Sequence, residues 1–126
     1  MTPLATVEAF VAAWNRMDLD AIVGALSDDI HYHNIPLAPI DGRDAVRRYL
    51  EDAWQFSECR WTLTHAAAAG DVVLTERIDA FVINGHDVVL PVMGTFEIRG
   101  GRIAAWRDYF DLATYRAQLQ AALPQS

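Results

Sequence analysis

Arg77 and Asp79 stand two residues apart in segment 72–82, which is rich in β-branched and apolar residues and is typical of a β-strand. Because strand side chains alternate between faces, both point the same way, roughly 7 Å apart along the strand. The same face carries Val73, Thr75 and Phe81, and the other carries Val72, Leu74, Glu76, Ile78, Ala80 and Val82. An ordinary amphipathic strand with a solvated Arg/Asp pair has the same pattern, so this spacing alone does not define a site.

Asp108 lies in a second strand-like segment, 102–110. It shares its expected face with Ala104, Trp106 and Phe110. A carboxylate among large aromatic side chains has to be paired, because burying it alone carries a large desolvation cost. If one strand separates the two segments, Arg77 can reach across it and hold Asp79 and Asp108 with its fork of donors. Such a trio is either a structural salt bridge or an acid–base pair, in which one carboxyl donates a proton and the other accepts one.

Tyr32 and Asn34 share one face of a short predicted strand, 30–35, with His31 and His33 on the other face. A tyrosine hydroxyl and an asparagine amide can hold a water molecule by several hydrogen bonds. Buried Tyr and Asn also commonly satisfy backbone groups, so the pair is supporting evidence only.

These side chains need a scaffold, and the sequence predicts one with four helices. Their apolar positions follow a period of three to four residues: Val7, Phe10, Val11 and Trp14; Leu19, Ile22, Val23 and Leu26; Val46, Tyr49, Leu50 and Ala53; Leu112, Tyr115 and Leu119. Thr2 and Asp111 are expected to cap the first and the last. Strands are predicted at 30–35, 62–69, 72–82, 88–99 and 102–110, and a frayed tail at 124–126.

The order α-α-β-α-β-β-β-β-α predicts one α+β domain spanning residues 1–126. Helices are expected on one side of a strongly curved, mostly antiparallel sheet, and together they would enclose a conical pocket suited to a small apolar ligand. Gly70-Asp71, Asn84-Gly85 and Gly100-Gly101 supply the turns between strands.

Composition limits the possible partners. The net charge of −7 and the lack of a basic cluster argue against nucleic-acid binding. No apolar run is long enough for a membrane helix, so we expect no membrane partner and a cytoplasmic location. The single cysteine, Cys59, excludes an internal disulfide and has no base nearby in sequence, and the four histidines do not match a known metal-ligand spacing. No glycine-rich phosphate loop is present, so we expect neither a metal nor a nucleotide cofactor.

Three separated motifs resemble the limonene-1,2-epoxide hydrolase family in order and spacing: Tyr32-His33-Asn34-Ile35-Pro36-Leu37 with Gly42-Arg43, Glu76-Arg77-Ile78-Asp79, and Trp106-Arg107-Asp108-Tyr109-Phe110-Asp111. The resemblance covers nearly the whole chain. It implies the cone-shaped α+β fold that this family shares with nuclear transport factor two and ketosteroid isomerase. It also implies a homodimer.

The resemblance implies roles as well. Asp108 would be the base, Asp79 the acid and Arg77 the bridge, while Tyr32 and Asn34 would join Asp108 in holding the water. A small apolar epoxide would then be opened to a vicinal diol with inversion and without a cofactor. From strand alternation and the expected meander, we predict that the substrate contacts Phe81, Leu90, Val92, Trp106 and Phe110.

Two other functions fit the same fold. An enolising isomerase or cyclase would use one Asp as base and Tyr32 as oxyanion donor, but Arg77 argues against it because a cation beside both acids favours their ionised forms over a neutral donor. A non-catalytic domain would simply bind an apolar ligand, with the ion pairs purely structural.

Overall fold

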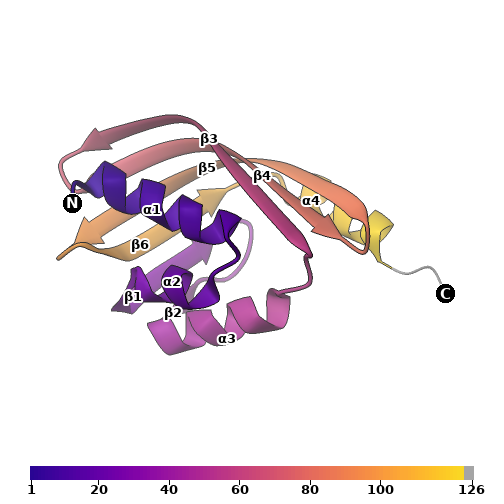
Figure 1. Ribbon diagram of the computed structural model, residues 1–126, viewed down its shortest axis with the longest axis horizontal. Helices are drawn as coiled ribbons and strands as arrows, with labels where there is room; N and C mark the ends of the chain where they lie inside the picture. Colours follow the sequence, from indigo (N-terminus) through magenta and orange to yellow (C-terminus); the bar gives the residue numbers. More distant parts are fainter. Residues whose placement is uncertain (124–126) are drawn as a thin grey trace.

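A curled six-stranded sheet forms the centre of the computed structural model, which describes residues 1–123 (Figure 1). The elements are α1 (Pro3–Asn15), α2 (Leu19–Gly24), β1 (Leu26–Asn34), β2 (Ile40–Asp41), α3 (Arg43–Ala53), β3 (Glu58–Ala69), β4 (Val72–Ile83), β5 (His86–Arg99), β6 (Arg102–Tyr109) and α4 (Leu112–Ala122). The strand order is β2-β1-β6-β5-β4-β3. Only β1 and β6 run parallel, so the predicted α+β class and mostly antiparallel sheet are confirmed.

Three of the four helices in residues 1–123, α1, α2 and α4, begin where a short polar side chain satisfies a free N–H group. Thr2 Oγ1 accepts from the Ala5 N–H at 3.1 Å, and Asp111 Oδ2 accepts from the Thr114 N–H at 3.2 Å, as predicted. Asp18 caps α2 in the same way. These caps fix the residue at which each capped helix begins and therefore which of its side chains can reach the sheet.

The concave face of the sheet is covered by helices. Phe10 of α1 packs edge-on against Phe96 of β5 and Trp106 of β6, with ring centroids 5.9 and 4.9 Å apart. At the opposite end, α4 packs on β5, and Ala122 lies in a small apolar cluster with Val88. Figure 1 shows α1, α2 and α3 gathered toward one end of the sheet and α4 at the other.

The strand boundaries differ from the predicted ones mainly at their starts. Leu26 begins β1 instead of ending a helix, because it is fully buried and pairs with Ile103 in β6. The two-residue strand β2 was not predicted, since a segment that short has no measurable alternation. β3 begins at Glu58, four residues earlier than expected. The predicted frayed tail at 124–126 lies outside the described residues.

Candidate active site

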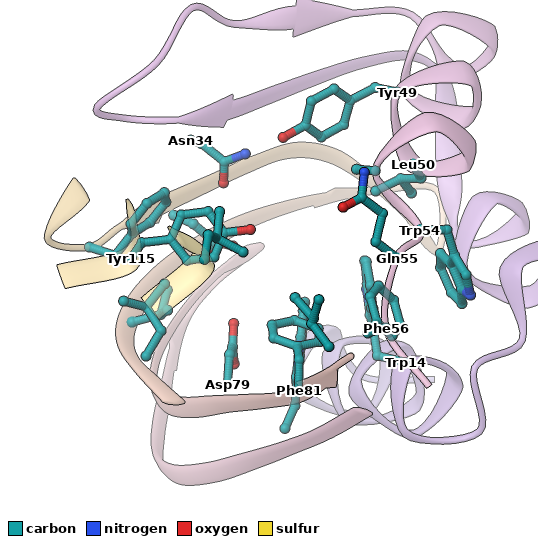
Figure 2. A pocket seen from close by; sticks show the side chains of 18 of the residues that line it. Trp14, Asn34, Tyr49, Leu50, Trp54, Gln55, Phe56, Asp79, Phe81 and Tyr115 are labelled. Carbon is teal, nitrogen blue, oxygen red and sulfur yellow. The ribbon is translucent and has the colours of Figure 1, made fainter. Parts of the chain in front are cut away.

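A cavity of about 260 Å³ lies between the concave face of the sheet and the helices (Figure 2). Aromatic and aliphatic side chains make most of its wall. Its polar lining residues are Tyr32, Asn34, Tyr49, Gln55, Asp79, Asp108 and Tyr115. A concave, mostly apolar space with a few convergent polar groups is the usual form of a small-molecule site.

Arg77 lies behind this wall, completely buried, and holds both acids. Its Nε and Nη2 atoms donate to the two carboxylate oxygens of Asp79 at 3.0 and 2.9 Å. Nη1 and Nη2 donate to the two oxygens of Asp108 at 3.1 and 3.0 Å. The remaining Nη1–H is directed to Thr75 Oγ1 at 3.4 Å. All five guanidinium donors are therefore used, and the interpretation of 72–82 as a strand with a solvated Arg/Asp pair is wrong.

Sheet register explains how residues on different strands meet. In the β4–β5–β6 meander, Gly94 of β5 pairs with Thr75 on one side and with Asp108 on the other. Asp108 is thus one strand away from Arg77, as the meander prediction requires. The guanidinium crosses β5 directly over Gly94.

Gly94 leaves the space that this crossing needs. A Cβ atom built at Gly94 would lie 2.3 Å from Arg77 Nη1 and 2.6 Å from Asp108 Oδ1, well inside contact distance. Gly94 was not among the residues predicted for the site, although a glycine within a strand often marks a close approach of another group.

Two aromatic rings pack against the Arg77 guanidinium. The Arg77 Cζ atom lies 4.6 Å from the Trp61 ring centroid and 5.8 Å from that of Phe96. A cation beside ring faces is stabilised by their quadrupoles, most strongly where water is excluded. Ion pairs and rings together hold the charge in a fixed position.

Burial and charge oppose each other at the acids. Burial raises the pKa of Asp79 to about 6, although the Arg77 guanidinium pulls it down, and the charge of Asp108 adds to the rise. Burial alone would lower the pKa of Arg77, but the two carboxylates outweigh burial and raise it. The guanidinium is permanently charged, whereas Asp79 can take up a proton close to neutral pH.

Tyr32 and Asn34 reach the acids through the parallel pairing of β1 with β6. Asn34 is the register partner of Asp108, and Tyr32 that of Trp106. The Asn34 amide donates to the Tyr32 hydroxyl at 2.9 Å, and the hydroxyl donates back to Asn34 Oδ1 at 3.2 Å. Burial and the charge of Asp108 raise the pKa of Tyr32, which keeps its phenol neutral. The five polar residues predicted for the site, Tyr32, Asn34, Arg77, Asp79 and Asp108, therefore meet in one place.

Four of the five apolar residues predicted to contact the substrate line the cavity. Phe81, Leu90, Val92 and Phe110 all line the cavity. Trp106 does not: it is fully buried beneath the site and stacks on Tyr32, with centroids 3.9 Å apart. It shares a strand face with Asp108, but Phe10 of α1 covers that end of the sheet. Trp106 thus supports Tyr32 instead of touching the cavity.

The other residues of the cavity wall depend on how distant elements pack together. The alternation of side chains along a single strand does not determine that packing. Trp14 of α1 stacks on Trp61 of β3, with centroids 4.4 Å apart, and both line the cavity. Tyr49 of α3 and Tyr115 of α4 enter from the helices. Their apolar periodicity identified them as inward-facing, but only the packing of the helices shows that they face the cavity.

The side chains considered for other chemistry lie elsewhere. His31 Nδ1 lies 2.6 Å from Asp41 Oδ1, on the opposite face of β1 from Tyr32. Within residues 1–123, no three His, Cys, Asp or Glu side chains are grouped as a metal site would require. Burial and the charge of Asp79 raise the pKa of Cys59 to about 12, so its thiol stays protonated.

Within residues 1–123, no helix has the length and apolar character needed to cross a membrane.

Comparison with known proteins identifies the class of this fold and site. Residues 1–120 match the model of the limonene-1,2-epoxide hydrolase catalytic domain. Epoxide hydrolase EphG of Mycobacterium tuberculosis is 38% identical over 106 residues, which are 84% of this chain and 71% of that protein. The chain belongs to the limonene-1,2-epoxide hydrolase family and is an epoxide hydrolase of that type.

Solved structures agree with this assignment. A structure described as an M. tuberculosis LEH-like epoxide hydrolase is 34% identical, with a TM-score of 0.83 over 95% of this chain and 90% of that one. A protein with a ketosteroid isomerase-like fold from Catenulispora acidiphila, in complex with trimethylamine, is 26% identical, with a TM-score of 0.80 over 98% and 96% of the two chains. The predicted relation to the ketosteroid isomerase fold is thereby confirmed.

The close approach at Gly94 yields a direct test. We expect Gly94→Ala to push the guanidinium away from Asp108 and to reduce the kcat for epoxide hydrolysis by roughly 10²-fold, since small misplacements of reacting groups have effects of that size. Gly24→Ala is the matched control, because a Cβ there meets nothing within 4 Å. Circular dichroism shows whether each variant folds. A folded Gly94→Ala enzyme with a wild-type kcat would contradict the proposed crossing.

Proposed function

We propose that this enzyme adds water to a small, mainly apolar epoxide in one step and gives a vicinal diol with inversion at the attacked carbon. The observation that carries the proposal is the fully buried guanidinium shared by Asp79 and Asp108, both of which face one cavity. Asp108 acts as the base, Asp79 as the acid and Arg77 as the bridge. Tyr32 and Asn34 join Asp108 in holding the water.

Charge supports this division of roles. Two carboxylates and one guanidinium carry a net charge of −1, and a single added proton makes the buried trio neutral, which a low-dielectric environment favours. The pKa of Asp79, raised by burial to about 6, favours that carboxyl as the place of the proton.

The reaction then balances without a cofactor. Asp108 accepts a proton from water while the water oxygen bonds to one oxirane carbon, and the carbon–oxygen bond breaks on the far side of that carbon. Asp79 donates its proton to the departing oxygen. Proton transfers by positioned groups typically contribute ~10²–10⁴-fold, and the orientation of the water adds to that. Afterwards the proton has moved from Asp79 to Asp108, and the resting state returns by proton exchange.

The positions of Asp79 and Asn34 support the geometry that this step needs. Figure 2 shows Asp79 entering the cavity from one side and Asn34 from the opposite side. An epoxide between them would have its oxygen toward Asp79 and a carbon toward the water held at Asn34. In a single turnover in heavy-oxygen water, the label is expected in the diol. Label in the protein would indicate an aspartyl ester and would contradict direct attack.

The polar side chains of the site also weigh against the alternative functions. An isomerase or cyclase would use the Tyr32 hydroxyl as its oxyanion donor, but that hydroxyl already donates to Asn34 Oδ1. A domain that only binds an apolar ligand has no use for two acids at its wall, because their desolvation opposes binding.

We also propose that the enzyme forms a homodimer through the convex face of the sheet. Leu74, Val89, Met93 and Tyr109 are all about half exposed on that face. The pairing of Glu76 with Met93, and of Met93 with Tyr109, brings side chains of β4, β5 and β6 into one row. If light scattering of the purified protein gave the mass of a single chain, that result would contradict the homodimer.

A cytoplasmic location stays a prediction that rests on composition.

Substitution of each acid tests the assigned roles. Asp79→Asn and Asp108→Asn should each reduce the kcat on styrene oxide and cyclohexene oxide by ~10²–10⁴-fold, because an amide neither donates nor accepts the required proton. Asp52→Asn is the matched control, since Asp52 is exposed on α3. Near-wild-type turnover by either folded active-site variant would show that the roles are wrong.

A further inference from the structure

Three polar side chains line the cavity without a part in the proposed hydrolysis. They are Tyr49 of α3, Gln55 of the α3–β3 connection and Tyr115 of α4. Within residues 1–123, the side chains of Gln55 and Tyr115 make no hydrogen bond to the protein. Each of the three can both donate and accept, so the cavity has free hydrogen-bonding capacity away from the acids.

Tyr49 is the best placed of the three. Its ring lies edge-on to Tyr32, with centroids 6.0 Å apart. Figure 2 shows its hydroxyl on the side of Asn34, across the cavity from Asp79, with the Gln55 side chain pointing into the same space. The phenol therefore faces the cavity from the side of Asn34.

Both phenols are partly buried at the cavity wall. Burial raises the pKa of Tyr49, which the Asn34 side chain partly offsets. Burial also raises the pKa of Tyr115, and the neighbouring Tyr49 adds to that rise. Both hydroxyls thus stay neutral, and the Tyr115 ring packs edge-on against Phe110 at a centroid distance of 5.8 Å.

A purely hydrocarbon substrate would fit such a wall poorly. It would leave the Tyr115 hydroxyl without a hydrogen-bond partner among residues 1–123 and the Tyr49 hydroxyl with the Asn34 side chain alone, which opposes binding. A substrate oxygen at the same place would supply the missing hydrogen bonds. Sites built to hydrogen-bond a substrate oxygen discriminate against the analogue that lacks it.

We propose that Tyr49, with Tyr115 and Gln55 beside it, binds an oxygen substituent of the substrate, so that the preferred substrates are epoxides bearing a hydroxyl, ether or carbonyl group remote from the oxirane. This inference rests on the proposed function, because it places the oxirane between Asp79 and the water. The carbon skeleton still packs on the apolar walls. Tyr49 is thus a specificity-determining residue.

A matched pair of substrates tests the inference. Cyclohexene oxide and 4-hydroxycyclohexene oxide differ by one hydroxyl. The ratio of the two kcat/KM values, divided by the ratio of the two rates of acid-catalysed opening without enzyme, gives the effect of that hydroxyl on recognition by the enzyme. We expect the wild type to favour the hydroxylated ring by about fivefold, as one net hydrogen bond provides. Tyr49→Phe should bring the ratio close to one. Tyr109→Phe, which alters a phenol half exposed on the convex face, should keep the wild-type ratio.

The other outcomes separate the two proposals. Wild-type turnover of both compounds at equal efficiency would overturn the subsite and leave the hydrolysis proposal standing. An equal loss on both compounds in Tyr49→Phe would also overturn it, because Tyr49 would then act only by orienting Asn34. Failure of the wild type to open any epoxide would overturn the hydrolysis proposal and the subsite with it.

Discussion

The burial of one guanidinium between two carboxylates is the interaction on which this structure depends. Arg77 is completely enclosed, and each of its five N–H donors has an acceptor on Asp79, Asp108 or Thr75. A buried charge this well paired is tolerated, whereas removal of one partner leaves an uncompensated charge in the core. The same arrangement has a surplus of one negative charge, and that surplus makes a buried carboxyl ready to hold a proton. Stability and acid–base chemistry thus have a common physical origin.

The sheet is arranged around this interaction. Asp79 and Arg77 share β4, Asp108 lies across β5, and the parallel β1–β6 pairing brings Asn34 beside Asp108. Gly94 opens the path across β5. Because side chains alternate along every strand, a one-residue slip in any of these pairings would turn a polar group of the site to the convex face. The site therefore depends on the register of the whole sheet, and the helices close the cavity over it.

Local sequence patterns predicted much of this arrangement and failed where long-range packing decides. Alternation and turn residues placed Arg77, Asp79 and Asp108 on the correct faces, since both effects act within a few residues. Whether Arg77 would be solvated or buried could not be read from its own strand, because Trp61 and Asp108 arrive from distant segments. Trp106 shares its strand face with Asp108, yet α1 removes it from the cavity. Tyr49 needed the position of α3, which the sequence pattern does not give.

The protonation state of Asp79 is the most direct test of the account. Carbon-13 NMR of protein labelled at the aspartate side-chain carboxyl carbon would follow each acid through a pH titration. We predict one resonance with a midpoint near pH 6, where burial places the pKa of Asp79, and its disappearance in Asp79→Asn. An Asp79 resonance that titrates at the ordinary aspartate value of about 3.9 would contradict the shared-proton account.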